Sequence, residues 1–193
     1  IHESGKTSAE KWWDLKSEIQ NHSVIKNQVD WFRETFDSSI QLRMVSDVPV
    51  GVLLSAGLDS SSVLSSLHAQ KFKDIQAFTI GFKEEEHNES HLAKKLTEQY
   101  QYQFNTLQLD GSDLYDRLLT STYFQDEPLM HLSEPHLLAI SQFAKPSVKV
   151  LLSGEGADEL MGGYVRYKPL QFPSLLRSVA AISSVDAFSK KPR

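Results

Sequence analysis

The sequence contains no cysteine, which excludes disulfide bonds and thiolate metal sites. Such a composition suits a reducing compartment, so we expect a cytoplasmic protein. No apolar run approaches the roughly 20 residues that a membrane-spanning helix needs. The net charge is −5 at pH 7, and the basic residues are too dispersed to form a footprint for nucleic acid. We therefore expect neither a membrane nor a nucleic acid among the partners.

The chain of 193 residues is long enough for one domain with a sizeable core. It shows no internal repeat, no low-complexity segment and no signal-peptide pattern. Because it begins with Ile1 rather than an initiator methionine, we expect a fragment of a longer protein.

Hydrophobic periodicity predicts the elements. Apolar residues three and four positions apart predict an amphipathic helix over residues 24–43, after a loosely ordered stretch in which only Trp12, Trp13 and Leu15 are expected to pack. Strands are then expected at 49–54, 75–82, 103–109 and 148–152, and helices at 59–70, 89–100, 113–123 and 135–143. This alternation predicts an α/β fold with a parallel sheet and helices on both faces. The unbroken Val/Leu run of the last strand predicts burial on both of its faces.

The first chemical motif is the stretch Val48–Ser62, in which an apolar run stops at small and hydroxylated residues and a helical pattern follows. Helix N-termini bind anions because their free N–H groups and the positive end of the dipole point the same way. We interpret this turn as a pyrophosphate cradle, with Asp59 as a metal ligand. The residues concerned are Ser55, Ala56, Gly57, Asp59, Ser60 and Ser61. No lysine follows the glycine, so this is not a Walker A loop; the alternative is a plain serine-rich turn.

The second motif is Val148–Tyr164, where an apolar strand is followed by a glycine-rich turn and then by carboxylates. Glu155, Asp158 and Glu159 lie so close in sequence that they repel one another unless a cation or a helix dipole stabilises them. An acidic helix cap is the alternative for this motif taken alone. Both motifs follow strand ends, where parallel sheets bind their ligands.

In this order, the two motifs resemble the synthetase domain of the glutamine-hydrolysing asparagine synthetase B family. The matching segments are Ser46–Ser61, Phe78–Phe82, Asp126–Pro128, Ser153–Glu159, Gly162–Tyr164 and Trp13–Leu15. Other families with a PP-loop, the S-G-G-x-D-S motif, share the first loop but lack the S-G-E-G-x-D-E segment. The resemblance implies the adenine nucleotide alpha hydrolase-like fold of the PP-loop ATP pyrophosphatases.

The resemblance also implies an activity. The domain would adenylate a carboxylate, aspartate being the expected acceptor, with release of pyrophosphate from ATP in the presence of Mg²⁺. Ammonia from glutamine would then give the amide and AMP. We expect residues 1–22 to be the linker from a missing N-terminal glutaminase domain, 23–167 the synthetase domain, and 168–193 the start of a truncated C-terminal helical region. The glutaminase nucleophile is an N-terminal cysteine, so this chain cannot hydrolyse glutamine. A homodimer is left open.

Residue by residue, the resemblance implies catalytic roles for Glu155, Asp59 and Asp158, the two aspartates as Mg²⁺ ligands and Glu155 orienting the intermediate and managing protons. The implied nucleotide-binding residues are Leu53, Ser55, Ala56, Gly57, Asp59, Ser60, Ser61, Ile80, Ser153, Gly154 and Tyr164. Simple packing is the alternative for Leu53, Ile80 and Tyr164.

Two departures from the family pattern matter. Ala56 replaces the first glycine of the PP-loop, and its β-carbon costs stability if the backbone there needs a positive φ. His131, Glu134 and His136 interrupt the segment that should line the acceptor pocket. Two alternatives therefore stay open: a relative acting on another carboxylate, such as a β-lactam synthetase-like enzyme or a polysaccharide-precursor amidotransferase, and a non-catalytic ATP-binding module.

Overall fold

The computed structural model describes residues 7–21, 25–83, 88–131 and 133–172. The chain divides into two compact units, residues 1–39 and 40–193. Within the described part of the chain, no helix is both long and apolar enough to cross a bilayer. The expected start of the C-terminal helical region lies largely outside the described residues, and the predicted domain boundaries stay predictions.

The first unit contains α1, Leu15–Asn21, and most of α2, Gln28–Arg43. Asp14 caps α1 by accepting a hydrogen bond from Ser17 N at 3.0 Å, a typical use of aspartate before a helix. We expected this stretch to be loosely ordered, with its tryptophans packed. Instead Leu15–Asn21 forms a helix, and Trp12 is 93% exposed. The prediction of α2 is confirmed within the described residues.

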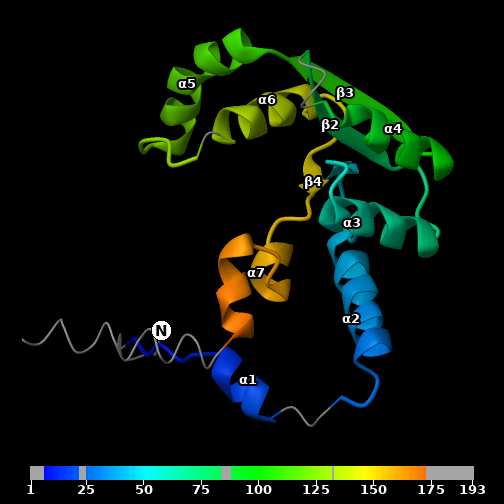
Figure 1. Ribbon diagram of the computed structural model, residues 1–193, viewed down its shortest axis with the longest axis vertical. Coiled ribbons are helices and arrows are strands. Elements are labelled where there is room, and N and C mark those ends of the chain that lie inside the picture. Colours follow the sequence, from blue (N-terminus) through cyan, green and yellow to red (C-terminus); the bar gives the residue numbers. More distant parts are fainter. Residues whose placement is uncertain (1–6, 22–24, 84–87, 132, 173–193) are drawn as a thin grey trace, which may run out of the picture. The chain divides into compact units, whose positions relative to one another are not determined.

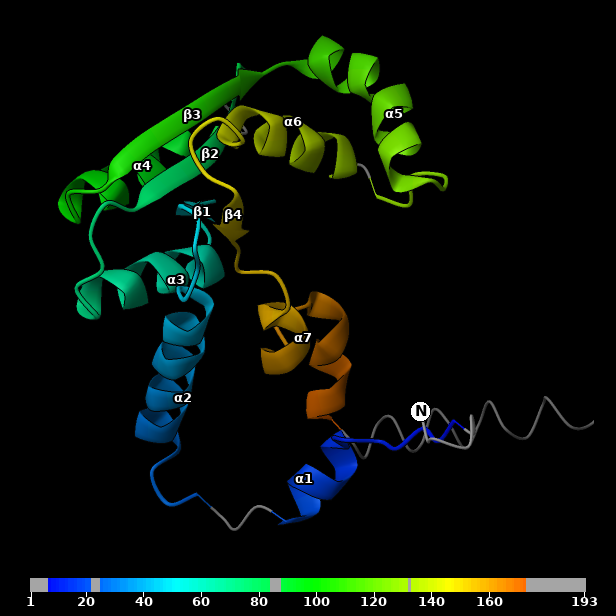
Figure 2. The ribbon, with the colours of Figure 1, turned by 180° about the vertical axis from the view of Figure 1, so that it is seen from behind.

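The sheet of the second unit has four strands, β1 Val50–Leu53, β2 Gln76–Phe82, β3 Gln103–Leu109 and β4 Val150–Leu152. All pairings are parallel and the order is β3-β2-β1-β4. Figure 1 shows this sheet from one side, and Figure 2, seen from behind, labels all four strands. The predicted parallel α/β fold is therefore confirmed. From β1 the chain proceeds through β2 to β3 and then returns to the other side of β1. The strand order thus reverses at β1, and such a switch point is where open α/β sheets bind ligands.

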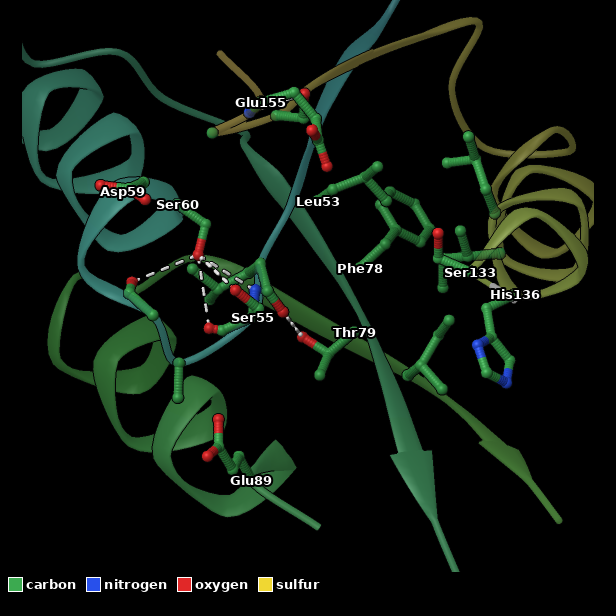
Figure 3. A pocket seen from close by; sticks show the side chains of 18 of the residues that line it. Leu53, Ser55, Asp59, Ser60, Phe78, Thr79, Glu89, Ser133, His136 and Glu155 are labelled. Atoms are coloured by element: carbon green, nitrogen blue, oxygen red, sulfur yellow. Dashed lines mark hydrogen bonds between the residues drawn. The ribbon is translucent and has the colours of Figure 1, made fainter. Parts of the chain in front are cut away.

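The helices of this unit are α3 Leu58–Ala69, α4 Ser90–Gln99, α5 Gly111–Gln125, α6 Glu134–Ala144 and α7 Ala157–Met161, followed by a 3₁₀ helix, Val165–Gln171. Side chains alternate between the two faces of a strand. Phe78 of β2 packs against Ile140 and Ala144 of α6, whereas its neighbours Ala77 and Thr79 are buried on the opposite face. Figure 3 shows α6 on one side of β2 and α3 and α4 on the other.

Gly51 lets the core close between β1 and β2. A β-carbon at this position would come within 2.8 Å of the Phe78 ring and 3.0 Å of the Gln76 carbonyl oxygen. Since interiors are close-packed, any side chain here would displace Phe78 from its place under α6.

The expectation for the fourth strand was wrong in one respect. β4 pairs with β1 alone among the described strands, and Val150 is 38% exposed. The residues of the apolar run have two different environments. Val148, before the strand, is buried in the core beside Phe78 and Ile140, whereas the strand itself lies at the edge of the sheet. Sequence alone does not separate such a run from a doubly buried strand.

Candidate active site

The loop after β1 is fixed by buried hydrogen bonds. Leu54 N donates to Phe78 O at 2.9 Å, and Thr79 Oγ1 donates to Leu54 O at 2.7 Å. Beyond this point the Ser60 hydroxyl, in a residue only 6% exposed, accepts from Ser55 N at 3.1 Å and lies 3.0 Å from Ser55 Oγ. Figure 3 shows the bonds of Ser60 converging on its hydroxyl and the separate bond of Thr79 beside them. The first turn of α3 therefore fixes the loop after β1 through the Ser60 hydroxyl.

Ala56 fits this loop without backbone strain. The described non-glycine residues with a positive φ are Lys71, Asp74, Gln101 and Asp126, so Ala56 is not among them. Gly57, which precedes α3, has φ −66° and ψ 156°, an ordinary extended conformation. The loop thus needs no left-handed residue at either position. The β-carbon of Ala56 therefore does not carry the cost in stability that a positive φ would impose.

The loop after β4 is shaped by its glycines. Gly156 has φ 91°, a conformation that L side chains rarely adopt. A β-carbon on Gly154 would lie 2.8 Å from Ser60 N and 2.9 Å from Asp59 Cβ. Gly154 therefore passes directly against the start of α3, and the two loops that the sequence singled out are in contact.

A second pair of glycines makes room for Asp158. Gly162 has φ 71° and ends α7, after which Gly163 N donates to Asp158 O at 3.1 Å. A β-carbon on Gly163 would overlap Asp158 Oδ1. The Asp158 carboxylate therefore rests on backbone that has no side chain.

Both loops open onto one cavity of about 540 Å³, a size usual for small-molecule sites. Of the predicted site residues, all but Ser61 line it: Leu53, Ser55, Ala56, Gly57, Asp59, Ser60, Ile80, Ser153, Gly154, Glu155, Asp158 and Tyr164. Ser61 lies in the first turn of α3, where its N–H donates to Gly57 O at 3.1 Å. Figure 3 shows Glu155 above Leu53 and Phe78, across the cavity from Glu89.

The lining also includes residues that the sequence analysis did not assign to the site, namely Thr79, Phe82, Glu89, Ser90, Leu137 and Ile140. Ser133, Glu134 and His136 line the cavity as well, in the segment that was expected to line the acceptor pocket. The signal available for them was the departure of residues 131–136 from the family pattern, which marks Glu134 and His136 but gives no hint of Glu89. His136 stands with its ring 5.4 Å from that of Phe82, and burial lowers its pKa.

The cavity is acidic. Its lining includes the carboxylates of Asp59, Glu89, Glu134, Glu155, Asp158 and Glu159, and neither lysine nor arginine is among its described lining residues. The low pKa of His136 keeps this imidazole neutral near pH 7. Bound anions therefore need cations that the described lining does not supply.

Tyr164 is tied to its acidic neighbour. Its hydroxyl donates to Glu159 Oε1 at 2.6 Å, which raises the pKa of Tyr164 to about 12 and lowers the pKa of Glu159. The guanidinium of Arg166 lies 4.1 Å from the centre of the Tyr164 ring, a cation–π arrangement. Arg166 was not among the predicted residues.

No group of three or more metal-ligating side chains occurs in the described ranges. Mg²⁺ does not require one, since it binds through one or two carboxylates together with waters and phosphate oxygens. Asp59 and Asp158 line the same cavity, and Gly154 brings their loops into contact. Two carboxylates on one cavity have the donor chemistry that Mg²⁺ prefers, and their assignment as its ligands stays a prediction.

The fold and the site define an α/β domain with its ligand cavity at the switch point of a parallel sheet. The chain belongs to the asparagine synthase family, whose profile, described as Asparagine synthase, matches residues 31–190. This confirms the resemblance seen in the two motifs.

Individual relatives cover the chain in part. It is 34% identical over 137 residues to asparagine synthetase [glutamine-hydrolyzing] 1 of Bacillus subtilis, a match that takes 70% of this chain and 21% of the relative. It is 33% identical over 146 residues to asparagine synthetase [glutamine-hydrolyzing] 3 of Arabidopsis thaliana, taking 70% of this chain and 25% of the relative. The match thus spans about a quarter or less of these relatives. Among solved structures, an NH3-dependent NAD synthetase from Campylobacter jejuni is 14% identical, with a TM-score of 0.49 over 72% of this chain and 61% of that one.

Proposed function

We propose that this chain is the ATP-dependent synthetase domain of an asparagine synthetase-like amidotransferase. It adenylates a small carboxylate with release of pyrophosphate, and ammonia then gives the amide and AMP. The observation that carries the proposal is the contact of Gly154 with Ser60 and Asp59. This contact joins a helix N-terminus, suited to phosphate, and a run of carboxylates in one cavity. The membership of the family supports the same chemistry.

In this proposal the loop after β1 binds the pyrophosphate part of ATP. Preorganised hydrogen-bond donors come from the N–H groups of Ala56 and Gly57 and from the Ser55 hydroxyl. The positive end of the α3 dipole adds to the attraction for the phosphates. Ser60 holds the loop in shape through its bonds to Ser55, and Ser61 continues the first turn. Leu53 and Ile80 form the apolar wall for the adenosine.

Asp59 and Asp158 would hold Mg²⁺, which neutralises negative charge on the leaving pyrophosphate when bound. The chain's own contribution is to place these two carboxylates in the first turns of α3 and α7, with Asp158 lying over Gly163. Without a cation, their repulsion would oppose binding of any phosphate.

The loop after β4 then serves the acyl-adenylate. Ser153 and Gly154 contact the AMP part, and Glu155 orients the intermediate and accepts a proton as ammonia attacks. Glu155 suits this role because it is exposed to the cavity and close to the loop that binds the phosphates. Tyr164 completes the wall beside Glu159.

Aspartate is the acceptor that the family suggests. Glu134 and His136 of α6 line the cavity, and neither lysine nor arginine is among its described lining residues. This favours the second candidate, an enzyme that acts on another carboxylate. A binding-only module is less well supported, because Ala56 imposes no strain and all three proposed catalytic carboxylates line the cavity. The glutaminase partner, a homodimer and a cytoplasmic location remain part of the proposal.

ATP–pyrophosphate exchange tests the proposal. With the protein at its full length and Mg²⁺ present, we expect an added carboxylate, aspartate first, to stimulate exchange. Asp59→Ala should abolish it, whereas Asp116→Ala, an exposed aspartate of α5 outside the cavity, should leave it unchanged. No exchange with any carboxylate, in a protein that still binds Mg-ATP, would refute adenylation and favour the binding module.

A further inference from the structure

The two edges of the sheet differ in how well they are protected against pairing with another strand. β4 is three residues long and directly follows Lys149, and short strands and lysines are usual protections of a sheet edge. β3 pairs with β2 in unbroken register from Gln103 to Leu109, and its seven residues include no charged residue and no proline. Figure 2 shows β3 as the outer strand, beyond β2. The β3 edge therefore lacks these protections.

Half of the backbone groups of β3 face away from the sheet. Gln103 N donates to Ile75 O at 3.1 Å, and Leu109 O accepts from Lys83 N at 3.2 Å, so the odd-numbered residues bond to the β2 side. Successive residues of a strand turn their N–H and C=O groups to opposite sides. Among the described strands, β3 has β2 as its one neighbour. The residues whose backbone groups face outward, without a partner strand, are Phe104, Thr106 and Gln108.

A second copy of the same strand suits this edge. Two antiparallel β3 strands related by a two-fold axis at Thr106 place Thr106 opposite Thr106 and Phe104 opposite Gln108. Because β3 carries no charge, self-pairing opposes no like charges, which destabilise strand pairs, and it gains a favourable pair of threonines. A two-fold contact also closes on itself, so that assembly stops at the dimer.

We propose that β3 is the dimer interface of this protein, where two copies pair their β3 strands antiparallel and join their sheets into one. The central Thr106 residues exchange two backbone hydrogen bonds, and their Cα atoms lie about 5.5 Å apart. The inference gives an interface to the homodimer that the proposed function includes. It does not depend on adenylation.

A proline at position 106 tests the pairing. Because the Thr106 N–H faces outward, Thr106→Pro removes no bond to β2, and edge strands tolerate proline in this orientation. The variant loses both bonds of the central pair. On the full-length protein, we expect sedimentation to show a dimer whose dissociation constant rises about thirtyfold or more in Thr106→Pro. Thr106→Ala, which keeps the N–H, should raise it about fivefold or less.

A cysteine at the same position gives a second measurement that needs no proline. The chain contains no cysteine of its own, and the expected separation of the paired Cα atoms falls within the 4.4–6.8 Å that disulfides usually span. We expect oxidation to link two copies of Thr106→Cys, with the link located by peptide mapping. Thr122→Cys, at an exposed position of α5, should form no such link. This measurement decides if circular dichroism shows that Thr106→Pro does not fold.

Hydrogen exchange of the wild-type protein identifies what covers the edge. The outward amides, at positions 104, 106 and 108, should be protected in the dimer and lose protection on dilution. Protection that persists in a monomer would mean that another segment of the longer protein covers β3, and would overturn the inference.

Three further results overturn it: a monomer at every concentration tested, an unchanged dissociation constant in a folded Thr106→Pro protein, or no disulfide between copies of Thr106→Cys. The proposed function fails separately, by absence of pyrophosphate exchange. A dimer that depends on Thr106 would survive that failure, and exchange by a monomer would leave the proposed function intact.

Discussion

The two loops that meet at the switch point are held by opposite means. The loop after β1 is tied by a buried hydroxyl, because Ser60 Oγ accepts from Ser55 N and lies within hydrogen-bond distance of Ser55 Oγ, Ser55 O and Gly57 O. The loop after β4 has weak internal bonds, such as Glu155 N to Ser153 Oγ at 3.4 Å. Its course depends instead on glycines at places where a side chain would collide.

Because of this difference, we expect the two loops to respond differently to substitution. A loop held by hydrogen bonds loses free energy when a donor or acceptor is removed, but its neighbours keep their places. A loop held by close backbone approach cannot accept even one added carbon without moving. We therefore expect substitutions in the second loop to affect activity more than stability, and substitutions in the first to do the reverse.

The largest effect is expected for Gly154→Ala. The new β-carbon would lie 2.8 Å from Ser60 N and 3.0 Å from the Asp59 carbonyl carbon, so the two loops must separate. Because displacements of about 1 Å can cost about 100-fold in rate, we expect pyrophosphate exchange to fall by about that factor. Gly111→Ala, where a β-carbon meets nothing within 4 Å, should leave exchange unchanged. Normal exchange in Gly154→Ala would show that the contact between the loops is not needed.

A smaller effect, confined to the metal, is expected for Gly163→Ala. The added carbon would overlap Asp158 Oδ1, so the carboxylate must turn away from its present position. Changes in groups that orient a ligand typically weaken metal binding by 10–100-fold, and we expect a roughly tenfold higher Mg²⁺ concentration for half-maximal exchange. Titration of exchange with Mg²⁺ measures this, with Gly111→Ala again as control. An unchanged Mg²⁺ dependence would argue against Asp158 as a ligand.

The two walls of the cavity also differ in how far the sequence predicted them. Residues of the phosphate side, such as Ser55 and Asp59, belong to short local motifs, and their residue types indicate their chemistry. The rest of the lining combines Glu89, just before α4, with Glu134 of α6, and only the packing of these two helices on the sheet shows that Glu89 lines the same cavity. The sequence also indicated a hydroxyl at Ser60 that could act in the loop. It did not predict that this hydroxyl turns toward Ser55, because that orientation depends on the turn into α3.

Ser60→Ala probes the first loop. Removing the hydroxyl of Ser60 takes away the acceptor of the part-buried Ser55 N–H, and the loss of such a hydrogen bond costs about 0.5–1.5 kcal/mol. We expect the free energy of unfolding, measured by urea denaturation, to fall by that amount. Ser62→Ala serves as the matched control, because the exposed Ser62 hydroxyl donates to Leu58 O within the same helix. Equal losses in the two variants would remove the distinction drawn between the loops.

The smallest effect concerns the hydrogen bond between Tyr164 and Glu159, at the edge of the cavity beyond the second loop. The hydrogen bond to this carboxylate raises the pKa of Tyr164 to about 12 from an ordinary 10.0, so the bond contributes stability below pH 10 that is lost as the pH rises through 12. The pKa of Glu159 is lowered from 4.5 by the same bond, so its contribution is present above pH 4.5 and is lost as the pH falls through the lowered value.

The titration of ¹³C-labelled tyrosines, followed by NMR, separates this bond from general burial. In Glu159→Gln we expect the pKa of Tyr164 to move back toward 10, because the negative acceptor that disfavours the tyrosinate is gone. Tyr102 provides the internal control: its pKa is raised chiefly by burial, and the substitution should not change it. If the pKa of Tyr164 stays near 12 in the variant, the hydroxyl is held by something other than Glu159. The edge of the cavity would then be fixed independently of the acidic loop.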